Sequence, residues 1–132
     1  MRHAFECAVR FDDLDAYGHV NNVTFAEYLQ EARVDFAHRY LADDLSPHEG
    51  SVVAHQSLDY HRPVPFRTEP LQVVLWVTRI GRSSFDVAYE IRDADTVYVT
   101  ATGALVAFDV AAERPRPLTE AERATLAKFL EP

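Results

Sequence analysis

Residues 11–22, FDDLDAYGHVNN, bring three carboxylates, a glycine, a histidine and two asparagines together ahead of a helical pattern. An Asp carboxylate can act as a general base on water or as a nucleophile on a carbonyl carbon. The start of a helix exposes unpaired N–H groups that can stabilise an oxyanion. Asp15, a turn held by Gly18 and a helix start at Asn22 would supply both parts of an acyl-transfer site. A solvated turn followed by an ordinary helix cap would explain the same residues without chemistry.

A metal site is the competing chemical interpretation of this stretch. Counted from Asp13, the residues DLDAYG imitate the start of a calcium loop, with Asp15 third and Gly18 sixth. The imitation fails at Tyr17 and Thr24, which stand fifth and twelfth, where that loop carries oxygen ligands. Most of the other histidines are scattered without the HxH or HxxxH spacing of a transition-metal site. We therefore expect no metal.

Other catalytic signatures are missing from the sequence. It contains no GxSxG nucleophile elbow, no Walker loop and no GxGxxG motif. The single cysteine, Cys7, excludes an internal disulfide and has no histidine partner by spacing. We expect Cys7 to be a small buried residue in a strand.

Composition places this 132-residue chain among globular proteins, and we expect residues 1–132 to form one domain. Apolar residues make up 48% of the chain and charged residues 26%. The net charge of −8 argues against nucleic-acid binding, which depends on neutralising phosphates. No apolar run approaches the roughly 18 residues that span a bilayer, and the N-terminus lacks the apolar core of a signal peptide. We therefore expect a cytoplasmic protein with no membrane partner.

The longest periodic segment predicts a helix over residues 22–40. Its apolar residues recur at intervals of three and four and form one face: Phe25, Leu29, Ala32, Phe36 and Tyr40. The helix start is ambiguous, because Asn21 and Asn22 are both good N-caps while Thr24 and Glu27 also fit a capping box.

Segments in which apolar residues recur at every second position precede and follow this helix. They predict five strands, over residues 3–11, 51–61, 71–80, 83–93 and 96–110. A short C-terminal helix is predicted over residues 119–130, capped by Thr119 with Glu122 three residues on. Short turns require antiparallel neighbours, and the long helix must cover the apolar face of the sheet. The expected architecture is α+β: a five-stranded antiparallel sheet around one long helix.

The segment RFDDLDAYGHVNNVTFAEYLQEAR, residues 10–33, closely resembles the opening of the hotdog-fold acyl-CoA thioesterases of the 4-hydroxybenzoyl-CoA thioesterase type. Further matches follow in the same order, at LDYHRPV, RIGRSSF and ATGALVAFD, so that the resemblance covers about residues 3–130. It implies a hotdog fold and the hydrolysis of an acyl-CoA thioester to a free acid and coenzyme A. No cofactor is implied beyond the coenzyme A of the substrate.

The resemblance also implies roles for single residues. Asp15 matches the catalytic carboxylate, and Asn22 matches the helix-start position whose backbone N–H polarises the thioester carbonyl. Gly18 and His19 match the connecting turn. Glu31 matches a glutamate within the helix, for which a salt bridge with an arginine is the structural alternative.

In this interpretation, arginine side chains would bind the phosphates of coenzyme A. Four arginines fall near predicted strand ends in the middle of the chain: Arg62, Arg67, Arg79 and Arg82. Arginine grips phosphate in bidentate fashion, so a local arginine pocket is compatible with an acidic surface. By the resemblance, Arg62 and the hairpin residues Arg82, Ser83 and Ser84 fall where relatives hold these phosphates, with Arg82 the better candidate.

Two departures from the family pattern are Phe25, where a tyrosine is usual, and PFRTEPL, which lacks a Gly-Asp often found in that turn. The sequence does not show which second residue would assist the catalytic carboxylate. The candidate helpers are Glu27, Glu31, His55, Ser57 and Asp59.

The resemblance also implies an oligomeric state and names the functions that compete with hydrolysis. Relatives pair edge to edge with sites between subunits, so we expect a homodimer, with a homotetramer as the alternative. The rival functions are an acyl-carrier-protein thioesterase and a non-catalytic binder of acyl-CoA or acyl-carrier protein. A hotdog hydratase is disfavoured, because its motif needs four residues between its Asp and His, and Asp15 and His19 have three.

Overall fold

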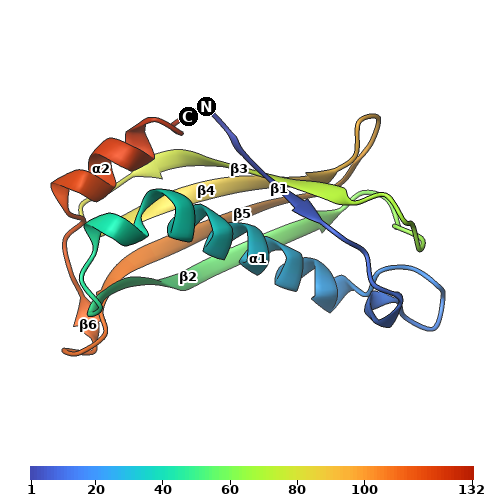
Figure 1. Cartoon of the computed structure of the whole chain (residues 1–132), viewed down its shortest axis with the longest axis horizontal. Coiled ribbons are helices and arrows are strands. Elements are labelled where there is room, and N and C mark those ends of the chain that lie inside the picture. The colour runs from blue at the N-terminus through green and yellow to red at the C-terminus, as the bar shows by residue number, and fades with distance from the viewer.

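A curved antiparallel sheet, with the long helix α1 (Asn22–Tyr40) lying across one face, dominates the computed structural model, which describes all residues 1–132 (Figure 1). The main strands are β1 (His3–Cys7), β2 (Glu49–Tyr60), β3 (Leu71–Ile80), β4 (Ser84–Arg92) and β5 (Val97–Asp109). Their order in the sheet is β1-β3-β4-β5-β2, and all neighbours are antiparallel. The predicted α+β architecture, with one long helix on a five-stranded sheet, is therefore confirmed.

Short elements complete the chain. The two-residue strand β6 (Arg114–Pro115) pairs with β5, and the helix α2 (Glu120–Ala127) lies at the opposite end of the sheet from the acidic loop (Figure 1). The predicted capping box of α2 is present, since Thr119 accepts the Glu122 N–H and Glu122 accepts the Thr119 N–H. Single turns of 3-10 helix occupy Phe11–Asp13 and Ala42–Asp44.

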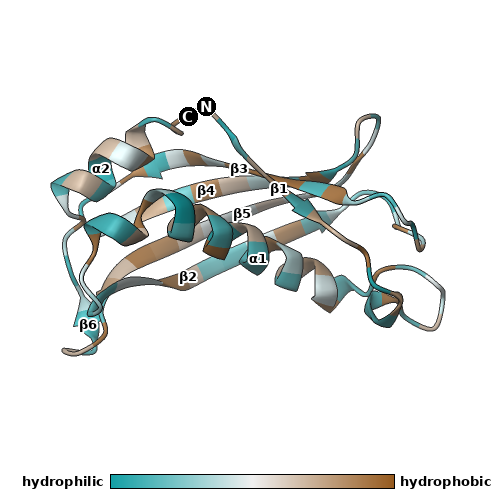
Figure 2. Cartoon of the chain, viewed as in Figure 1, coloured by the Kyte–Doolittle hydropathy of each residue, from teal (hydrophilic) through white to brown (hydrophobic).

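Asn21 caps the start of the helix α1. The side chain of Asn21 accepts the N–H of Val23 at 2.9 Å, so Asn21 is the N-cap and the Thr24–Glu27 alternative is not used. Hydrophilic and hydrophobic residues are mixed along α1, as a helix with one buried face requires (Figure 2). Neither helix of the chain combines the length and the apolar character needed to cross a bilayer.

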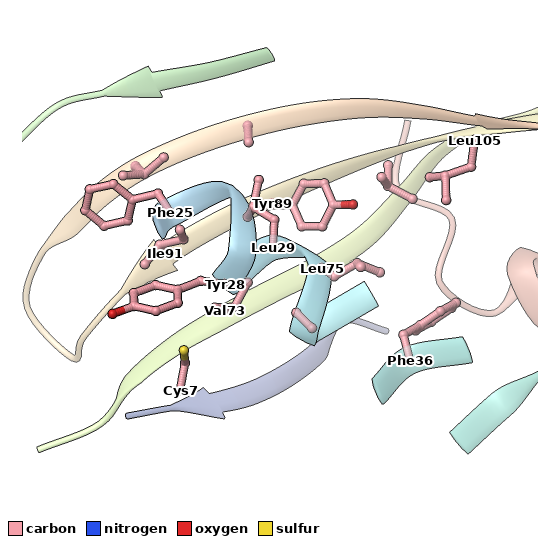
Figure 3. Packing of buried hydrophobic residues seen from close by; sticks show 14 of the residues in the cluster. Cys7, Phe25, Tyr28, Leu29, Phe36, Val73, Leu75, Tyr89, Ile91 and Leu105 are labelled. Atoms are coloured by element: carbon pink, nitrogen blue, oxygen red, sulfur yellow. The ribbon is translucent and has the colours of Figure 1, made fainter. Parts of the chain in front are cut away.

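The buried face of α1 packs on the middle strands of the sheet. It consists of Phe25, Tyr28, Leu29, Ala32 and Phe36. Figure 3 shows the four larger of these residues against Val73 and Leu75 of β3 and Tyr89 and Ile91 of β4. The predicted stripe was right for four of its five residues. Tyr40, at its end, is 37% exposed, and Tyr28, near the start of the helix, is an additional buried residue.

The first strand is shorter than the predicted range of residues 3–11. Its pairing with β3 ends at Cys7, which lies opposite Leu71, the first residue of β3. Beyond Cys7 the chain has no neighbour to pair with, so it leaves the sheet and forms the acidic loop. Cys7 itself is buried as predicted, and burial raises the pKa of its thiol to about 11.

The strand β2 forms a free edge of the sheet. It pairs with β5 on one side only, and most of its residues are exposed. Its register shifts between Val53 and His55, where the strand carries a bulge. The other edge strand, β1, has only five residues.

We expect Leu29→Ala to lower the free energy of unfolding by about 2–5 kcal/mol, because Leu29 is fully buried at the centre of the helix–sheet contact. Urea unfolding measures this change. Val34→Ala, on the exposed side of the same helix, should change that free energy by no more than about 0.5 kcal/mol. Equal losses in the two variants would contradict the packing described here.

Candidate active site

A tight turn shapes the acidic loop around Asp15. The N–H of Asp15 donates to the carbonyl of His19 at 2.8 Å, and the N–H of Gly18 donates to the carbonyl of Asp15 at 3.0 Å. Leu14 and Val20 form an antiparallel bridge that closes the loop. Gly18 has a φ of 80°, in the left-handed region that glycine adopts without steric cost. The sequence Asp-Ala-Tyr-Gly-His therefore folds locally into a turn that holds Asp15 at its base.

The turn also orients the carboxylate of Asp15. One oxygen, Oδ1, accepts the N–H groups of Tyr17 at 2.9 Å and His19 at 3.3 Å. No donor of the chain reaches the other oxygen, Oδ2, and the side chain is only half-buried. Asp15 is thus fixed through one oxygen and presents the other to a ligand or to water.

The neighbouring carboxylates have different surroundings. Asp13 is buried and accepts the Tyr28 hydroxyl at 2.7 Å and the Arg10 N–H at 2.9 Å, while the Arg10 guanidinium binds its other oxygen. Burial would raise the pKa of Asp13, but these hydrogen bonds hold it below its usual range. Asp12 is exposed. Asp13 therefore anchors the loop, and Asp15 is the carboxylate left free for chemistry.

The start of α1 offers one unpaired backbone donor. The N–H of Val23 is bound by the Asn21 side chain, and the N–H of Thr24 donates to the Asn21 carbonyl at 2.9 Å. The N–H of Asn21 donates to the carbonyl of Asp13 at 2.9 Å. Among the first-turn amides, the N–H of Asn22 has no acceptor in the chain. It can therefore bind an oxygen atom supplied by a ligand.

A cavity of about 310 Å³ joins the carboxylate to this helix start. Its lining residues come from the acidic loop, from α1 and from the end of β2: Asp15, His19, Val20, Asn22, Phe25, Tyr60, His61, Arg62 and Pro63. Of the predicted site residues, Asp15, His19, Asn22 and Arg62 meet here, and Gly18 shapes the turn beside it.

Two residues of this cavity that carry polar side-chain groups, Tyr60 and His61, were missed in the sequence. The hydroxyl of Tyr60 donates to the carbonyl of Asn22 at 3.3 Å, and its ring lies 5.9 Å from that of Phe25. His61 contacts the hydroxyl of Thr100 at 2.7 Å through its Nε2. Both residues directly precede Arg62 in LDYHRPV, so the signal was present in a motif from which only the arginine was selected.

Other predicted residues lie elsewhere in the chain. Glu31 is exposed on α1 and lines a separate hollow of about 250 Å³ beside Cys7 and Arg10. No basic side chain lies within ion-pair distance of Glu31, so the salt bridge considered as its structural alternative does not form. Three candidate helpers, His55, Ser57 and Asp59, pair with outward-facing residues of β5 and point away from α1. They cannot reach Asp15 from that face.

The four arginines near strand ends divide into two pairs. Arg67 binds Asp93 at 2.8 Å and Arg79 binds Asp86 at 2.9 Å, so both guanidinium groups are occupied within the fold. Arg62 and Arg82 have no acidic partner. These two guanidinium groups are available to an anionic ligand.

The hairpin of Arg82, Ser83 and Ser84 lies at the α2 end of the sheet, far from the acidic loop (Figure 1). The N–H of Leu118, just before α2, donates to the carbonyl of Arg82 at 2.9 Å. The hydroxyl of Ser84 is already bound by Arg79 at 3.1 Å. Within one chain this hairpin and Asp15 are therefore too far apart to bind the same small group.

Comparison with known proteins gives this site its context. The profile of the "Thioesterase-like superfamily" matches residues 9–129. The chain belongs to that superfamily. The uncharacterized protein YsmA of Bacillus subtilis (strain 168) is 32% identical over 124 residues, which cover 90% of this chain and 81% of YsmA.

Solved structures extend the match to three dimensions. A thioesterase from Thermus thermophilus, crystallised with coenzyme A and Zn, is 33% identical to this chain and has a TM-score of 0.81. The match covers 93% of this chain and 95% of the Thermus chain. The PA2801 protein from Pseudomonas aeruginosa is 32% identical to this chain and has a TM-score of 0.84. The match covers 92% of this chain and 95% of the PA2801 chain. The predicted resemblance to hotdog-fold thioesterases of the 4-hydroxybenzoyl-CoA thioesterase type is therefore confirmed.

We expect Tyr28→Phe to lower the free energy of unfolding by about 1.5–3 kcal/mol at neutral pH, since it removes a hydrogen bond to a charged carboxylate. Because the folded pKa of Asp13 is depressed, this stabilisation is complete above about 3.9, the ordinary pKa of Asp. It should shrink as the pH falls through the lower, folded pKa.

Urea unfolding of both proteins, from neutral pH down to the lowest pH at which they stay folded, measures this difference. Tyr17→Phe is the matched control, because the Tyr17 hydroxyl is exposed and makes no hydrogen bond in the chain. A Tyr28→Phe penalty that is the same at every pH would contradict a charged Asp13.

Proposed function

We propose that this protein hydrolyses acyl-CoA thioesters to a free acid and coenzyme A. One observation carries the proposal: Asp15, with a free carboxylate oxygen, lines the same cavity as Asn22, whose N–H is the unpaired amide at the start of α1. A carboxylate and an oxyanion donor on one cavity are the parts that acyl transfer to water needs.

In the proposed reaction, the thioester carbonyl oxygen accepts the N–H of Asn22, and negative charge that develops on this oxygen is stabilised there. One such donor contributes about 2.7–4 kcal/mol to the transition state. Asp15 takes a proton from water while the water oxygen bonds to the carbonyl carbon. The C–S bond then breaks and coenzyme A leaves as a thiolate, which takes up a proton. A thiol of pKa about 8.5 leaves without a strong general acid.

Asp15 can alternatively attack the carbonyl carbon itself and form a mixed anhydride that water then hydrolyses. A single turnover in water labelled with heavy oxygen can detect this route. Attack of water on the Asp15 carbonyl carbon of the anhydride leaves label in the Asp15 carboxylate, a result that general-base catalysis cannot give.

Coenzyme A offers phosphates to the two arginines that have no acidic partner. Arg62 lines the Asp15 cavity, whereas Arg82 lies at the far end of the sheet with Ser83 and Ser84. We infer that these two groups belong to one site made by two subunits. The Thermus thermophilus relative crystallised with coenzyme A is consistent with such a ligand.

The free edge of the sheet supports a homodimer as part of the proposal. β2 is twelve residues long, contains no proline or lysine, and exposes Val52, Val53 and Tyr60 by 43%, 44% and 51%. A long edge strand of this kind favours pairing with a second strand. Antiparallel pairing of two β2 edges about a two-fold axis would bring the Arg82 hairpin of one subunit toward Asp15 of the other.

We expect Asp15→Asn to lower kcat by about 100- to 10,000-fold, the range of general-base catalysis, while far-ultraviolet circular dichroism stays unchanged. Release of coenzyme A from a panel of acyl-CoA thioesters, followed with a thiol-reactive chromophore, measures this loss. Asp12→Asn is the matched control, because Asp12 is an exposed neighbour that does not line the cavity.

Near-normal turnover in Asp15→Asn would remove Asp15 from the mechanism. Saturable binding of acyl-CoA without thiol release by the wild type would favour a binding protein instead. Activity on acyl-carrier protein alone would favour that class of thioester.

We expect Arg62→Gln and Arg82→Gln each to raise KM for an acyl-CoA about fivefold or more, equivalent to about 1 kcal/mol for an exposed ion pair. KM for the matching acyl-pantetheine, which lacks the nucleotide phosphates, should not change. Arg114→Gln, at an exposed arginine of β6 with no acidic partner, serves as the control. Equal effects on both thioesters would show that these arginines do not bind the phosphates.

A further inference from the structure

Arg33 lies on the side of α1 that faces β2, and it has no acidic partner. Its side chain is half-buried, and no carboxylate of the chain lies within ion-pair distance of it. The Nη1 nitrogen donates to the side-chain oxygen of Gln56 on β2 at 3.2 Å and to the hydroxyl of Tyr89 on β4 at 3.2 Å. A half-buried cation that is bound only by neutral groups leaves part of its desolvation cost unbalanced.

Donors outnumber acceptors around Arg33. Nη1 is the only nitrogen of its guanidinium group with an acceptor in the chain. Because arginine only donates, the amide oxygen of Gln56 must face it, and the amide nitrogen of Gln56 has no acceptor in the chain either. The Tyr89 hydroxyl accepts from Arg33, and its own proton has no acceptor. The cluster therefore presents unpaired donors from every member, while both of its acceptors already bind Arg33.

Tyr89 gives this cluster a fixed base. It is 1% exposed, and its ring belongs to the core that α1 covers (Figure 3). Burial raises the pKa of its hydroxyl above the ordinary value, so the hydroxyl keeps its proton at neutral pH and remains a donor. A donor that is already held in place lowers the free energy cost of ordering a site when a ligand binds.

A carboxylate is the group that suits this set of donors. Its oxygens match the planar fork of a guanidinium group and have further lone pairs for the hydroxyl and the amide. A single negative charge balances the charge of Arg33, whereas a phosphate dianion would leave excess negative charge in a chain whose net charge is already −8. An uncharged acceptor would leave the charge of Arg33 without a partner.

We propose that Arg33, Gln56 and Tyr89 bind a carboxylate group of a small molecule. Two sources supply such a group: the far end of the acyl group of a thioester, or a separate acid that is not part of the substrate. Only the first source rests on the proposed function. Gln56 precedes Tyr60, which lines the Asp15 cavity, by four residues of β2, a distance of about 13 Å at about 3.3 Å per residue. A carboxylate on the acyl group would therefore have to stand at the end of a long chain.

Thioethers of coenzyme A test the first source without hydrolysis, because a thioether has no carbonyl to attack. Isothermal titration calorimetry compares S-(10-carboxydecyl)-CoA with S-undecyl-CoA, and the short S-(4-carboxybutyl)-CoA with S-pentyl-CoA. We expect the long carboxylated thioether to bind about tenfold or more tightly than its uncharged counterpart, which corresponds to about 1.4 kcal/mol. The short pair should show no such preference, because its carboxylate does not reach Arg33.

Substitutions within the cluster test which side chains cause the preference. Arg33→Leu should remove it, and Tyr89→Phe, which deletes only a hydroxyl and keeps the buried ring, should reduce it. Arg39→Leu is the matched control, because Arg39 is an exposed arginine of the same helix that binds Asp35. It should keep the wild-type preference.

Free acids test the second source. Succinate, glutarate and benzoate are titrated separately into the full chain at constant ionic strength, with sodium chloride as the comparison salt. A separate acid should bind saturably to the wild type and to Arg39→Leu, and about tenfold or more weakly to Arg33→Leu. Binding of free acids without a preference between the long thioethers assigns the site to a separate acid, and the reverse result assigns it to the acyl group.

These measurements also separate this inference from the proposed function. A protein that binds a carboxylate through Arg33 but releases no coenzyme A from any acyl-CoA would overturn hydrolysis and leave this site intact. A protein that hydrolyses acyl-CoA but shows neither the thioether preference nor saturable binding of free acids would overturn the site alone. A preference or an acid affinity that survives Arg33→Leu would overturn it as well.

Discussion

The buried carboxylate of Asp13 closes the acidic loop, and the geometry around Asp15 depends on that closure. Its side chain binds the Tyr28 hydroxyl on α1 and the main chain and guanidinium of Arg10, while its carbonyl accepts the N–H of Asn21. The chain is thus held at both ends of the loop against the first turns of the helix. Without this anchor, neither the turn of Asp15 nor the Asn21 cap would have a fixed position relative to the other.

Closely spaced aspartates acquire different roles here because their donors differ. Asp13 is surrounded by donors and excluded from water, which makes it structural. Asp15 has donors on one oxygen only, at the edge of a cavity. In the proposed reaction, an orienting bond on one oxygen reduces the freedom that the carboxylate must lose, and positioning of this kind can account for a large part of an enzyme's rate enhancement. The loop therefore stabilises the fold and presents a carboxylate with one free oxygen, using neighbouring residues of one short sequence.

Local features of this fold could be predicted from the sequence, and long-range ones could not. The helical spacing from Phe25 to Phe36 and the proximity of Asp15 to Asn22 are set by a few residues along the chain, so the pattern was sufficient. The end of β1 depends on where β3 begins, a contact between segments more than sixty residues apart. Tyr60 and His61 reach the cavity only because β2 ends beside the helix start, and the hairpin of Arg82 is remote from Asp15 because β3 ends at the α2 end of the sheet (Figure 1).

The bulge in β2 determines which way the two ends of that strand face. Side chains alternate between the two faces of a strand, so residues nine positions apart would normally point to opposite sides of the sheet. One extra residue between Val53 and His55 resets this alternation. Ser51, opposite Ala107, and Tyr60, opposite Val99, consequently both point toward α1. Deleting Ala54 would put the strand out of phase and turn one of its two ends toward the outer surface, so a single inserted residue keeps the side chains of Ser51 and Tyr60 on the same side of the sheet.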